Sequence, residues 1–408
     1  MALTFNYRAR DAGSGKMIHS TVSADSEAEA ARLLMAQNIV PLEMKVIDDK
    51  KGNLFGSAGR VKAKDRVIFT RQLSTMLNAG LPLAQSLTTV QEQTQSRTLK
   101  TIVAGIINDV NGGSSLGDSF AKSPKVFNQV YVALVRAGET SGTLDKSLER
   151  LANQEEHDAD MLSKIRGAMY YPAIVLAVII AVLVFMLVML VPQVANMFSE
   201  MHQSMPLQTI ITVAVYDFMI HFWWLIIIVI VGGVFLLNRW IKTGSGRKTW
   251  DTMKLNTPLF SGLFRKLYMA RFSRISQTLL ASGVPMLDAL NIASDAVNNV
   301  VVKEEILRAR GKVKNGKPLS EGLLNETYIL EFVPQMIKIG ETSGGIDGML
   351  GKVADYYDKE VDQTVANISS LIEPILMVAM GLMIMFILFA VIVPIYTLAS
   401  AASSGGLQ

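Results

Sequence analysis

The chain has 408 residues, of which 50% are hydrophobic and 18% charged, and its formal net charge is +4 at pH 7. Globular chains average about 25% charged residues, so this composition excludes a disordered or collagen-like protein and indicates segments that lie in lipid. The chain contains no cysteine, which excludes disulfides, thiolate metal sites and a cysteine nucleophile. The small net charge gives no argument for nucleic-acid binding.

The first 47 residues are expected to form a small α+β domain, residues 1–47. Alternating or β-branched runs predict strands near residues 5–7, near residue 22 and over 42–47, with a short helix over 26–37. The apolar core of a cleavable signal peptide is absent, so this end of the chain is expected to be cytoplasmic. The polar, glycine-containing segment 48–62 is expected to be a linker.

Three long stretches lack internal charged residues, and each is long enough for the roughly 20 helical residues that cross a bilayer. Transmembrane helices are therefore expected over residues 169–192, 221–238 and 371–398. Pro172, Glu373 and Pro374 stand where the first and third of these helices enter the membrane. For Glu373 two interpretations stay open: a side chain that reaches the lipid interface, and a contact with a partner or a neighbouring helix.

Basic residues are distributed unequally around these helices. They flank the first helix at its start and the second at its end, whereas residues 193–220 contain neither lysine nor arginine. Because basic flanks stay on the cytoplasmic side, the segments 63–168 and 239–370 are expected to be cytoplasmic. The loop 193–220 and the tail 399–408 are then expected to be periplasmic.

Three blocks of sequence recur 202 or 203 residues further along the chain. The segment 69–82 recurs as 272–285, and the motif Gly-Glu-Thr-Ser-Gly of residues 138–142 recurs at 340–344. The prolines that bound the first transmembrane helix recur around the third. The agreement of the offsets predicts two copies of a cytoplasmic antiparallel helix bundle, each leading into a transmembrane helix. The second transmembrane helix has no counterpart, and it returns the chain to the side on which it started.

Within the first copy, apolar residues at three- and four-residue spacing predict helices. These are expected over residues 84–94, 97–111, 115–122 and 126–137. A glycine and a proline two residues later interrupt the first helix of each copy. These turn residues are Gly80, Pro82, Gly283 and Pro285.

The Gly-Glu-Thr-Ser-Gly motifs are expected to end one helix and to start the next. Gly138 can adopt the left-handed conformation that ends a helix, Ser141 can cap the next helix, and Asp145 lies near its positive end. A structural turn and an interaction surface both stay open for the motif. The candidate residues are Gly138, Glu139, Thr140, Ser141, Gly142 and Asp145, with Gly340, Glu341, Thr342, Ser343, Gly344 and Asp347 in the second copy.

The chain offers no convincing catalytic or metal-binding set. The four histidines are scattered, and the charged run 155–158 is expected to be a solvated helix face. Residues 112–119 have the glycine spacing of a phosphate-binding loop, but Asp118 takes the place of its lysine. We therefore expect no enzyme activity, no cofactor and no metal.

These features resemble the type II secretion system F family. The resemblance rests on the paired Gly-Glu-Thr-Ser-Gly motifs 202 residues apart, the two glycine–proline turns, and the opening FNYRARDAGSGK with SEAEAARLL. The family includes the PilC-type platform proteins of type IV pili and the equivalent proteins of type II secretion. It implies a mainly α-helical, multi-pass and oligomeric scaffold of the bacterial inner membrane.

The resemblance also implies partners. These are a cytoplasmic hexameric assembly or retraction ATPase, pilin or pseudopilin subunits, other inner-membrane assembly proteins, the lipid bilayer and further copies of the chain, with no nucleic acid. It implies that the motif residues are structural or contact residues. If they are contact residues, charge reversal at Glu139 and Glu341 is expected to abolish filament assembly. A pilus platform is the preferred interpretation and a type II secretion platform the alternative, with an oligomeric small-solute transporter and a membrane-anchored enzyme as remote ones.

Overall fold

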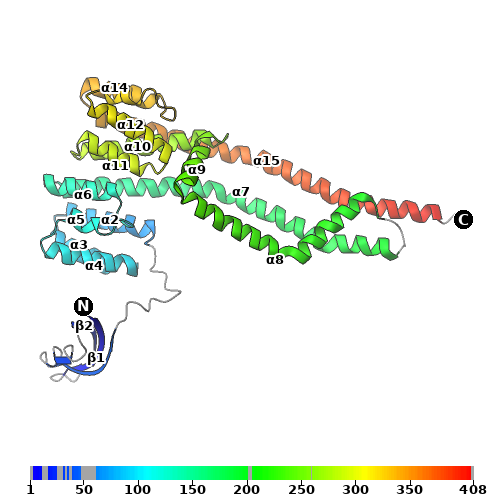
Figure 1. Ribbon diagram of the computed structural model, residues 1–408, viewed down its shortest axis with the longest axis horizontal. Helices are drawn as coiled ribbons and strands as arrows, with labels where there is room; N and C mark the ends of the chain where they lie inside the picture. Colours follow the sequence, from blue (N-terminus) through cyan, green and yellow to red (C-terminus); the bar gives the residue numbers. More distant parts are fainter. Residues whose placement is uncertain are drawn as a thin grey trace. The chain divides into compact units, whose positions relative to one another are not determined.

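The computed structural model describes residues 3–11, 17–24, 31–32, 35, 39–46, 61–200, 205–258 and 260–405 (Figure 1). The chain separates into two compact units, residues 1–60 and residues 61–408. Helices make up most of the described residues, which confirms the mainly α-helical class expected from the sequence.

The first unit contains a three-stranded antiparallel sheet. Its strands are β1 (Leu3–Asp11), β2 (Met17–Ala24) and β3 (Ile39–Val46), in the order β2-β1-β3. The register of β1 and β3 shifts between Arg8 and Ala9, beside Pro41. Proline has no N–H for the ladder, and an edge strand next to an irregularity tolerates it. The helix expected over 26–37 falls outside the described residues except at 31, 32 and 35, and so does the linker up to residue 60.

The second unit begins with a set of five short helices. They are α2 (Ala63–Asn78), α3 (Leu83–Gln93), α4 (Arg97–Asn111), α5 (Leu116–Ala121) and α6 (Gln129–Ser141). Polar side chains fix several starts, because Ser96, Ser115 and Asn128 each accept a hydrogen bond from a backbone N–H of the first turn. The cap at Asn128 explains why α6 begins at residue 129 and not at 126.

A second set of helices follows later in the chain. It comprises α9 (Gly244–Asn256), α10 (Ser261–Ala281), α11 (Met286–Ala296), α12 (Val300–Lys314), α13 (Leu319–Leu323) and α14 (Phe332–Ser343). The helices α3 and α11 both have 11 residues, and α4 and α12 both have 15. We call residues 61–200 the first half and residues 244–405 the second half.

Three long helices complete the unit, namely α7 (Leu144–Glu200), α8 (Leu207–Ile241) and α15 (Ile346–Gly405). Each contains a segment that is long and apolar enough to cross a membrane. The helices α7 and α15 run side by side in the same direction, and α8 runs back in the opposite direction (Figure 1). Large side chains on α8 such as Trp223 and Ile228 are exposed, which suits a surface that lipid covers.

Helix therefore extends beyond the segments expected to lie in the membrane. Most of the predicted loop 193–220 is helical, since α7 continues to Glu200 and α8 starts at Leu207. The helix α8 changes direction at Phe222, whose φ and ψ are −116° and 18°. Continuous helices satisfy their own backbone hydrogen bonds, which apolar surroundings require.

An aromatic cluster forms the core of the first half. Phe69, Phe120, Phe127 and Tyr131 are all buried, and the rings of Phe120 and Phe127 lie 4.5 Å apart between centroids. Edge-on contacts of this kind add to the free energy of burying the rings. The equivalent buried positions in the second half include Phe272, Leu323 and Val333. The second core is accordingly built from one aromatic ring and aliphatic side chains at these places.

Replacing Phe120 by alanine is expected to lower the free energy of unfolding by about 3–5 kcal/mol, because the cavity left between three other rings cannot collapse. Urea unfolding of the detergent-solubilised chain, followed by near-UV circular dichroism, measures the change. The matched control is Met253→Ala on the exposed face of α9, which should stay within about 0.5 kcal/mol of the wild type. Equal effects of the two substitutions would contradict the packing described.

Candidate functional site

Each Gly-Glu-Thr-Ser-Gly motif forms the junction between a short helix and a long one. The helices α6 and α14 end here, and the glycines that follow, Gly142 and Gly344, have φ angles of 69° and 76°. The N–H of Thr143 donates to the carbonyl of Gly138 at 2.8 Å, which is the hydrogen bond of a Schellman turn. Glycine at these two positions lets the chain turn directly into the next helix.

Two expectations for this motif are wrong. Gly138 is not the left-handed residue, because it lies inside α6. Ser141 does not cap α7, since it is the last residue of α6 and its hydroxyl donates back to the carbonyl of Ala137 at 2.8 Å. The motif offers a glycine at each end, and local sequence cannot decide which of them turns.

The first glycine of each motif is required because two helices touch there. A Cβ atom on Gly138 would lie 2.6 Å from the Cβ of Ser147 on α7. On Gly340 it would lie 2.8 Å from the Cα of Ile346 on α15. Any larger residue would therefore push the short helix away from the start of the long one.

The glutamate of each motif caps a neighbouring short helix. The carboxylate of Glu139 accepts hydrogen bonds from the N–H groups of Leu116 at 2.7 Å and Gly117 at 3.1 Å, at the start of α5. Glu341 accepts from the N–H of Leu319 at 2.6 Å and of Ser320 at 3.2 Å, at the start of α13. A carboxylate is favoured at the positive end of a helix, where N–H groups lack partners within the helix.

This cap bears on two sequence hypotheses. In residues 112–119, whose glycine spacing is that of a phosphate-binding loop, the helix N–H groups that an anion would use are occupied by Glu139. Charge reversal at Glu139 or Glu341 would break these internal bonds. Loss of filaments in such variants would therefore not by itself identify a contact surface.

The other motif residues have local contacts. Asp145 and Asp347 lie half-buried in the first turns of α7 and α15, where a negative charge interacts favourably with the helix dipole. The hydroxyl of Thr342 donates to the carbonyl of Lys338 at 3.1 Å, and Thr140 is exposed.

The glycine–proline turns lie where the sequence predicted them. Gly80 and Gly283 have φ angles of 81° and 83°, a region that favours glycine. Pro82 and Pro285 stand immediately before α3 and α11, where the missing N–H of proline costs no hydrogen bond.

The residues at the predicted membrane boundaries lie within the long helices. Pro172 is half-buried on α7, while Glu373 and Pro374 are exposed on α15. Each proline leaves one helix carbonyl without its usual donor, and the helix continues through it. Both interpretations of Glu373 stay predictions.

Two equivalent arginines tie each bundle to its long helix. Arg71 on α2 donates to Glu156 at 2.6 Å and to Asn153 at 2.6 Å, both on α7. Arg274 on α10, which is 203 residues further on, donates to Asp358 and Asp355 on α15, both at 2.6 Å.

A second ion pair in the first half lies largely out of contact with solvent. Nε of Arg66 donates to Oε2 of Glu155 at 2.7 Å, and Glu155 is only 6% exposed. Burial raises the pKa of Glu155, against the lowering effect of Arg66. The expectation that 155–158 is a solvated helix face is therefore wrong for this residue. In the second half the equivalent positions hold buried Met269 and Tyr357, so apolar packing replaces the ion pair.

Sequence reasoning missed these acidic partners, although the repeat offset would have paired Glu156 with Asp358. The signal was present in the charged run 155–158 and in its copy 202 residues later. What was absent was any way to know that α2 lies beside α7, and α10 beside α15.

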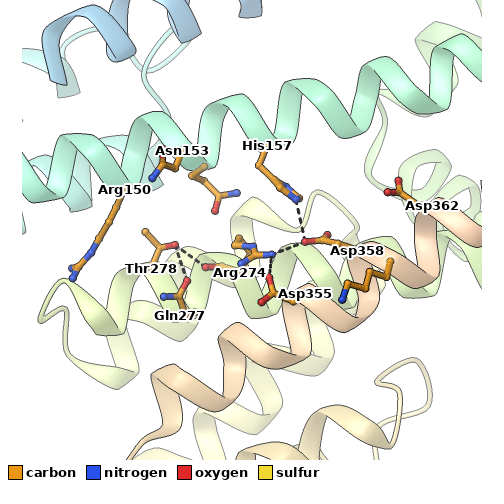
Figure 2. A pocket seen from close by; sticks show the side chains of 11 residues that line it. Arg150, Asn153, His157, Arg274, Gln277, Thr278, Asp355, Asp358 and Asp362 are labelled. Carbon is orange, nitrogen blue, oxygen red and sulfur yellow. Dashed lines mark hydrogen bonds and ion pairs between the residues drawn. The ribbon is translucent and has the colours of Figure 1, made fainter. Parts of the chain in front are cut away.

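A polar cleft of about 620 Å³ opens between the two halves, and α7, α10 and α15 line it. Figure 2 shows His157 reaching from α7 toward Asp358 on α15, which also receives Arg274. The Nε2 of His157 and Oδ2 of Asp358 are 3.1 Å apart. At one end of the cleft Arg150 donates to the carbonyl of Ala281 at 2.6 Å.

The charges in this cleft change the pKa values of its ionisable groups. The hydrogen bond to Asp358 raises the pKa of His157 above its ordinary value. Burial by itself would raise the pKa of Asp358, but the hydrogen bonds from His157 and Arg274 lower it by a larger amount. The pKa of Asp358 therefore lies below its ordinary value. The contact thus favours a charged histidine facing a charged carboxylate.

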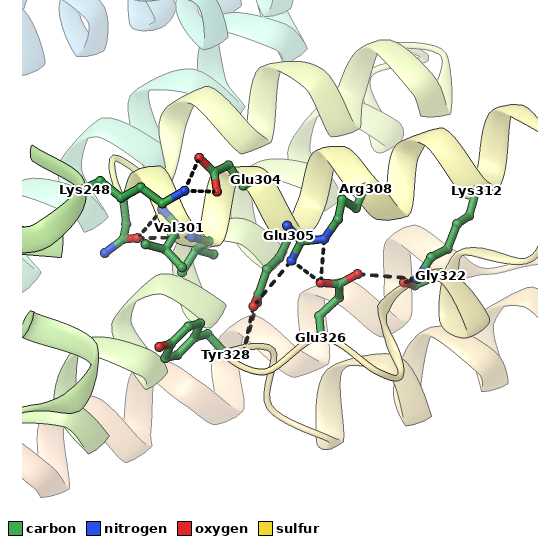
Figure 3. A network of polar contacts seen from close by, with 11 residues as sticks. Lys248, Val301, Glu304, Glu305, Arg308, Lys312, Gly322, Glu326 and Tyr328 are labelled. Carbon is green, nitrogen blue, oxygen red and sulfur yellow. Dashed lines mark hydrogen bonds and ion pairs between the residues drawn. The ribbon is translucent and has the colours of Figure 1, made fainter. Parts of the chain in front are cut away.

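A separate polar network braces the second half (Figure 3). Glu305 on α12 accepts from the backbone N–H of Tyr328 at 3.1 Å, and Arg308 pairs with Glu326 at 2.5 Å. Burial raises the pKa of Glu305. These bonds tie α12 to the segment after α13. Among the described residues, no group of three or more histidine or acidic side chains is placed to hold a metal ion.

Comparison with known families gives matches over most of the chain. The family profile described as "Type II secretion system (T2SS), protein F" matches residues 69–192 and again residues 272–394. The profile described as "Type II secretion system protein F, N-terminal domain" matches residues 1–45.

Individual relatives match over nearly their full lengths. "Type IV pilus assembly protein PilC" of Thermus thermophilus is 36% identical over 408 residues, which cover 98% of this chain and 99% of that protein. The protein of the same name from Pseudomonas aeruginosa is 36% identical, with 90% and 97% covered. "Type II secretion system protein F" of Vibrio cholerae is 31% identical, with 96% and 97% covered.

The substitution Gly138→Ala is expected to lower the free energy of unfolding by about 1–3 kcal/mol, because the added methyl group meets Ser147. Thermal unfolding in detergent measures the effect. Gly105→Ala on α4 is the matched control, since no atom lies within 4 Å of its added Cβ and alanine favours helix by about 0.5–1 kcal/mol. The close-contact argument fails if Gly138→Ala is as well tolerated as the control.

The substitution His157→Gln is expected to destabilise the chain at about pH 6 by roughly 0.5 kcal/mol and to have little effect near pH 9. The pKa of His157 is raised in the folded chain. Its contribution to the free energy of unfolding is therefore complete below the ordinary pKa of 6.5 and is lost as the pH rises through the raised pKa. The pKa of Asp358 is lowered, so the contribution of Asp358 to that free energy persists at all pH values above its ordinary pKa of 3.8.

Melting temperatures at the two pH values measure this dependence. Lys164→Gln is the control, because it removes the 2.7 Å ion pair with Asp362 between the same two helices. The pKa of Lys164 is raised above its ordinary 10.5 by the hydrogen bond to Asp362, so its effect should be equal at both pH values. A His157→Gln effect that does not change with pH would contradict the ion pair.

Proposed function

The chain belongs to the type II secretion system protein F family, and from this membership we propose that it is the inner-membrane platform on which a type IV pilus is assembled. The observation that carries the proposal is the match to "Type IV pilus assembly protein PilC" at 36% identity over 98% of the chain. Relatives named "Type II secretion system protein F" are 30–32% identical. The equivalent platform of a secretion system is therefore the second candidate.

We infer that the two halves are copies of one unit. The double match of the family profile supports this, and so do the equal lengths of α3 and α11 and of α4 and α12. The proposed organisation is an N-terminal α+β domain, a linker, and two antiparallel bundles that each lead into a transmembrane helix. The N-terminal domain is residues 1–47 and the linker is 48–62. The first bundle, 63–168, leads into the transmembrane helix 169–192, and the loop 193–220 and the return helix 221–238 follow. The second bundle, 239–370, leads into the transmembrane helix 371–398 and the tail 399–408.

The proposed orientation places the N-terminus and both bundles in the cytoplasm. The basic flanks of the long apolar helices support this, since residues 193–220 contain no lysine or arginine. The loop and the C-terminal tail then lie in the periplasm. Both bundles are thereby accessible to cytoplasmic proteins.

The partners proposed are a cytoplasmic hexameric ATPase and pilin subunits, together with other inner-membrane assembly proteins. ATP hydrolysis belongs to the ATPase in this scheme, and the platform has no catalytic role. Pilin subunits pass between the bilayer and the filament while in contact with the platform.

Continuous helices give this platform a way to transmit displacement. The helices α7 and α15 run without interruption from the bundles through the apolar segments, over 57 and 60 residues. Arg71 and Arg274 fasten the bundles to the bases of these helices. A force on a bundle is therefore passed along a stiff helix into the membrane. We assign the motif glutamates Glu139 and Glu341 to holding the junctions, through the caps on α5 and α13.

Deletion of the gene for this chain is expected to remove surface filaments while pilin accumulates in the membrane, because the platform acts after pilin synthesis. Electron microscopy and immunoblots of sheared filaments measure the outcome, and a plasmid copy of the wild-type gene is the control. Loss of secreted enzymes with filaments intact would favour the secretion platform. Normal filaments and normal secretion would overturn both.

A further inference from the structure

The two halves of the chain meet through different faces. On the first half the contact face is formed by α6 and α7, and on the second half by α10 and α11 together with the side of α15 that meets α7 (Figure 1). A cavity of about 220 Å³ in this contact is lined by Gln154 and Asp158 on one side and by Arg271 and Ile275 on the other. A contact between unlike faces of two similar units is heterologous, and it leaves one face of each unit unused.

The unused face of the first half is formed by α2 and α3, the equivalents of α10 and α11. Thr278 on α10 is only 5% exposed under the first half, whereas its equivalent Thr75 is exposed. Ile68, the equivalent of Arg271, is 46% exposed. This face therefore presents apolar and small side chains to its surroundings.

The unused face of the second half is formed by α14 and by the side of α15 that carries Tyr356, whose ring packs against Phe332 of α14. These two helices are the equivalents of α6 and α7. Gln154 is 6% exposed in the internal contact, whereas its equivalent Tyr356 is 44% exposed. Ile339 on α14 is 51% exposed. Large apolar side chains outside the membrane-spanning segments are costly to leave in water.

The two unused faces are complementary at the positions that meet in the internal contact. The polar residues Gln154 and Arg271 are replaced by Tyr356 and Ile68, so both partners change from polar to apolar together. An aromatic ring against an aliphatic side chain is a favourable pair for an interface.

A basic side chain is also kept at an equivalent position. Arg150, which donates to the last turn of α10, becomes the exposed Lys352. The last turn of α2 carries no basic residue of its own, so a lysine there would meet the negative end of the helix.

We propose that a second copy of this chain docks its α2/α3 face on the α14/α15 face of the first. The contact repeats between chains the one that joins the two halves within a chain. It deepens the proposed platform function by naming the surface through which the platform assembles.

The direction of the long helices determines what such a contact builds. Because α7 and α15 run in the same direction, the operation that relates the halves preserves that direction. Repeating it places every copy in the same sense across the membrane. The expected product is a ring or an arc of copies in the plane of the bilayer.

Thiol crosslinking tests the contact directly, because the chain has no cysteine. Ile68→Cys and Tyr356→Cys are introduced together, and native membranes are treated with a short bismaleimide. A ladder of covalent multimers is expected. Membranes that contain a mixture of the two single variants should give dimers and no higher species, since each chain then carries one reactive thiol.

Two further pairs serve as controls. Gln154→Cys with Arg271→Cys lies across the internal contact and should crosslink within a single chain, which shifts the mobility of the monomer. Met253→Cys with Tyr356→Cys should give no ladder, because Met253 is 53% exposed but lies on α9, outside both faces.

The proposal is overturned if the Ile68/Tyr356 pair stays monomeric while the internal pair reacts. It is also overturned if Ile68→Cys joins only proteins of other mass, or if the Met253 pair gives the same ladder. As a second measurement, Ile68→Asp should lower the multimeric fraction by about tenfold or more, because the contact would bury an unpaired charge, whereas Met253→Asp should not change it. If the ladder is absent in cells that still make filaments, the docking surface is contradicted and the platform function is not. If the ladder forms, but filaments and secretion survive deletion of the gene, the platform function is contradicted and the docking surface is not.

Discussion

The structure depends on one constraint, which is that backbone N–H and C=O groups in apolar surroundings must be paired within the same segment. An α-helix meets this condition, and each of the three long helices contains a segment long and apolar enough to cross a membrane. The helices α7 and α15 extend far beyond that requirement, since they start inside the bundles at Leu144 and Ile346. Each bundle is thus joined to its membrane segment by a continuous helix, which passes through Pro172 in α7 and Pro374 in α15.

The junctions at the start of these helices follow from this arrangement. A short helix must stop, reverse and pack against the long one within a few residues, so the Gly-Glu-Thr-Ser-Gly motif needs a glycine for the turn and a glycine for the close approach. The carboxylate between them satisfies the free N–H groups of α5 or α13. Local geometry explains the motif in both halves. Its repetition therefore indicates the same helix junction in each half and does not by itself identify a partner.

Positions 202 or 203 residues apart in the two halves carry different side chains where their surroundings differ. The buried pair of Arg66 and Glu155 has Met269 and Tyr357 as its counterparts. Gln154, which is polar, is buried in the contact between the halves, whereas the corresponding residue of the second half, Tyr356, has an exposed ring. The side chains at corresponding positions of the two halves therefore differ with what each face meets.

Sequence alone determined the helical class, the three apolar segments and the repeat. Composition and periodicity report directly on lipid exposure and on helical faces, and the positive φ angles of Gly80 and Gly283 follow from their turn motif. Only the tertiary structure decided that Gly142, and not Gly138, turns the chain, and that Glu155 is buried in the run taken for a solvated face. It also decided that His157 faces Asp358 across the cleft between the halves. These facts depend on which helix lies beside which, and a linear pattern carries each helix's own periodicity but not the identity of its neighbour.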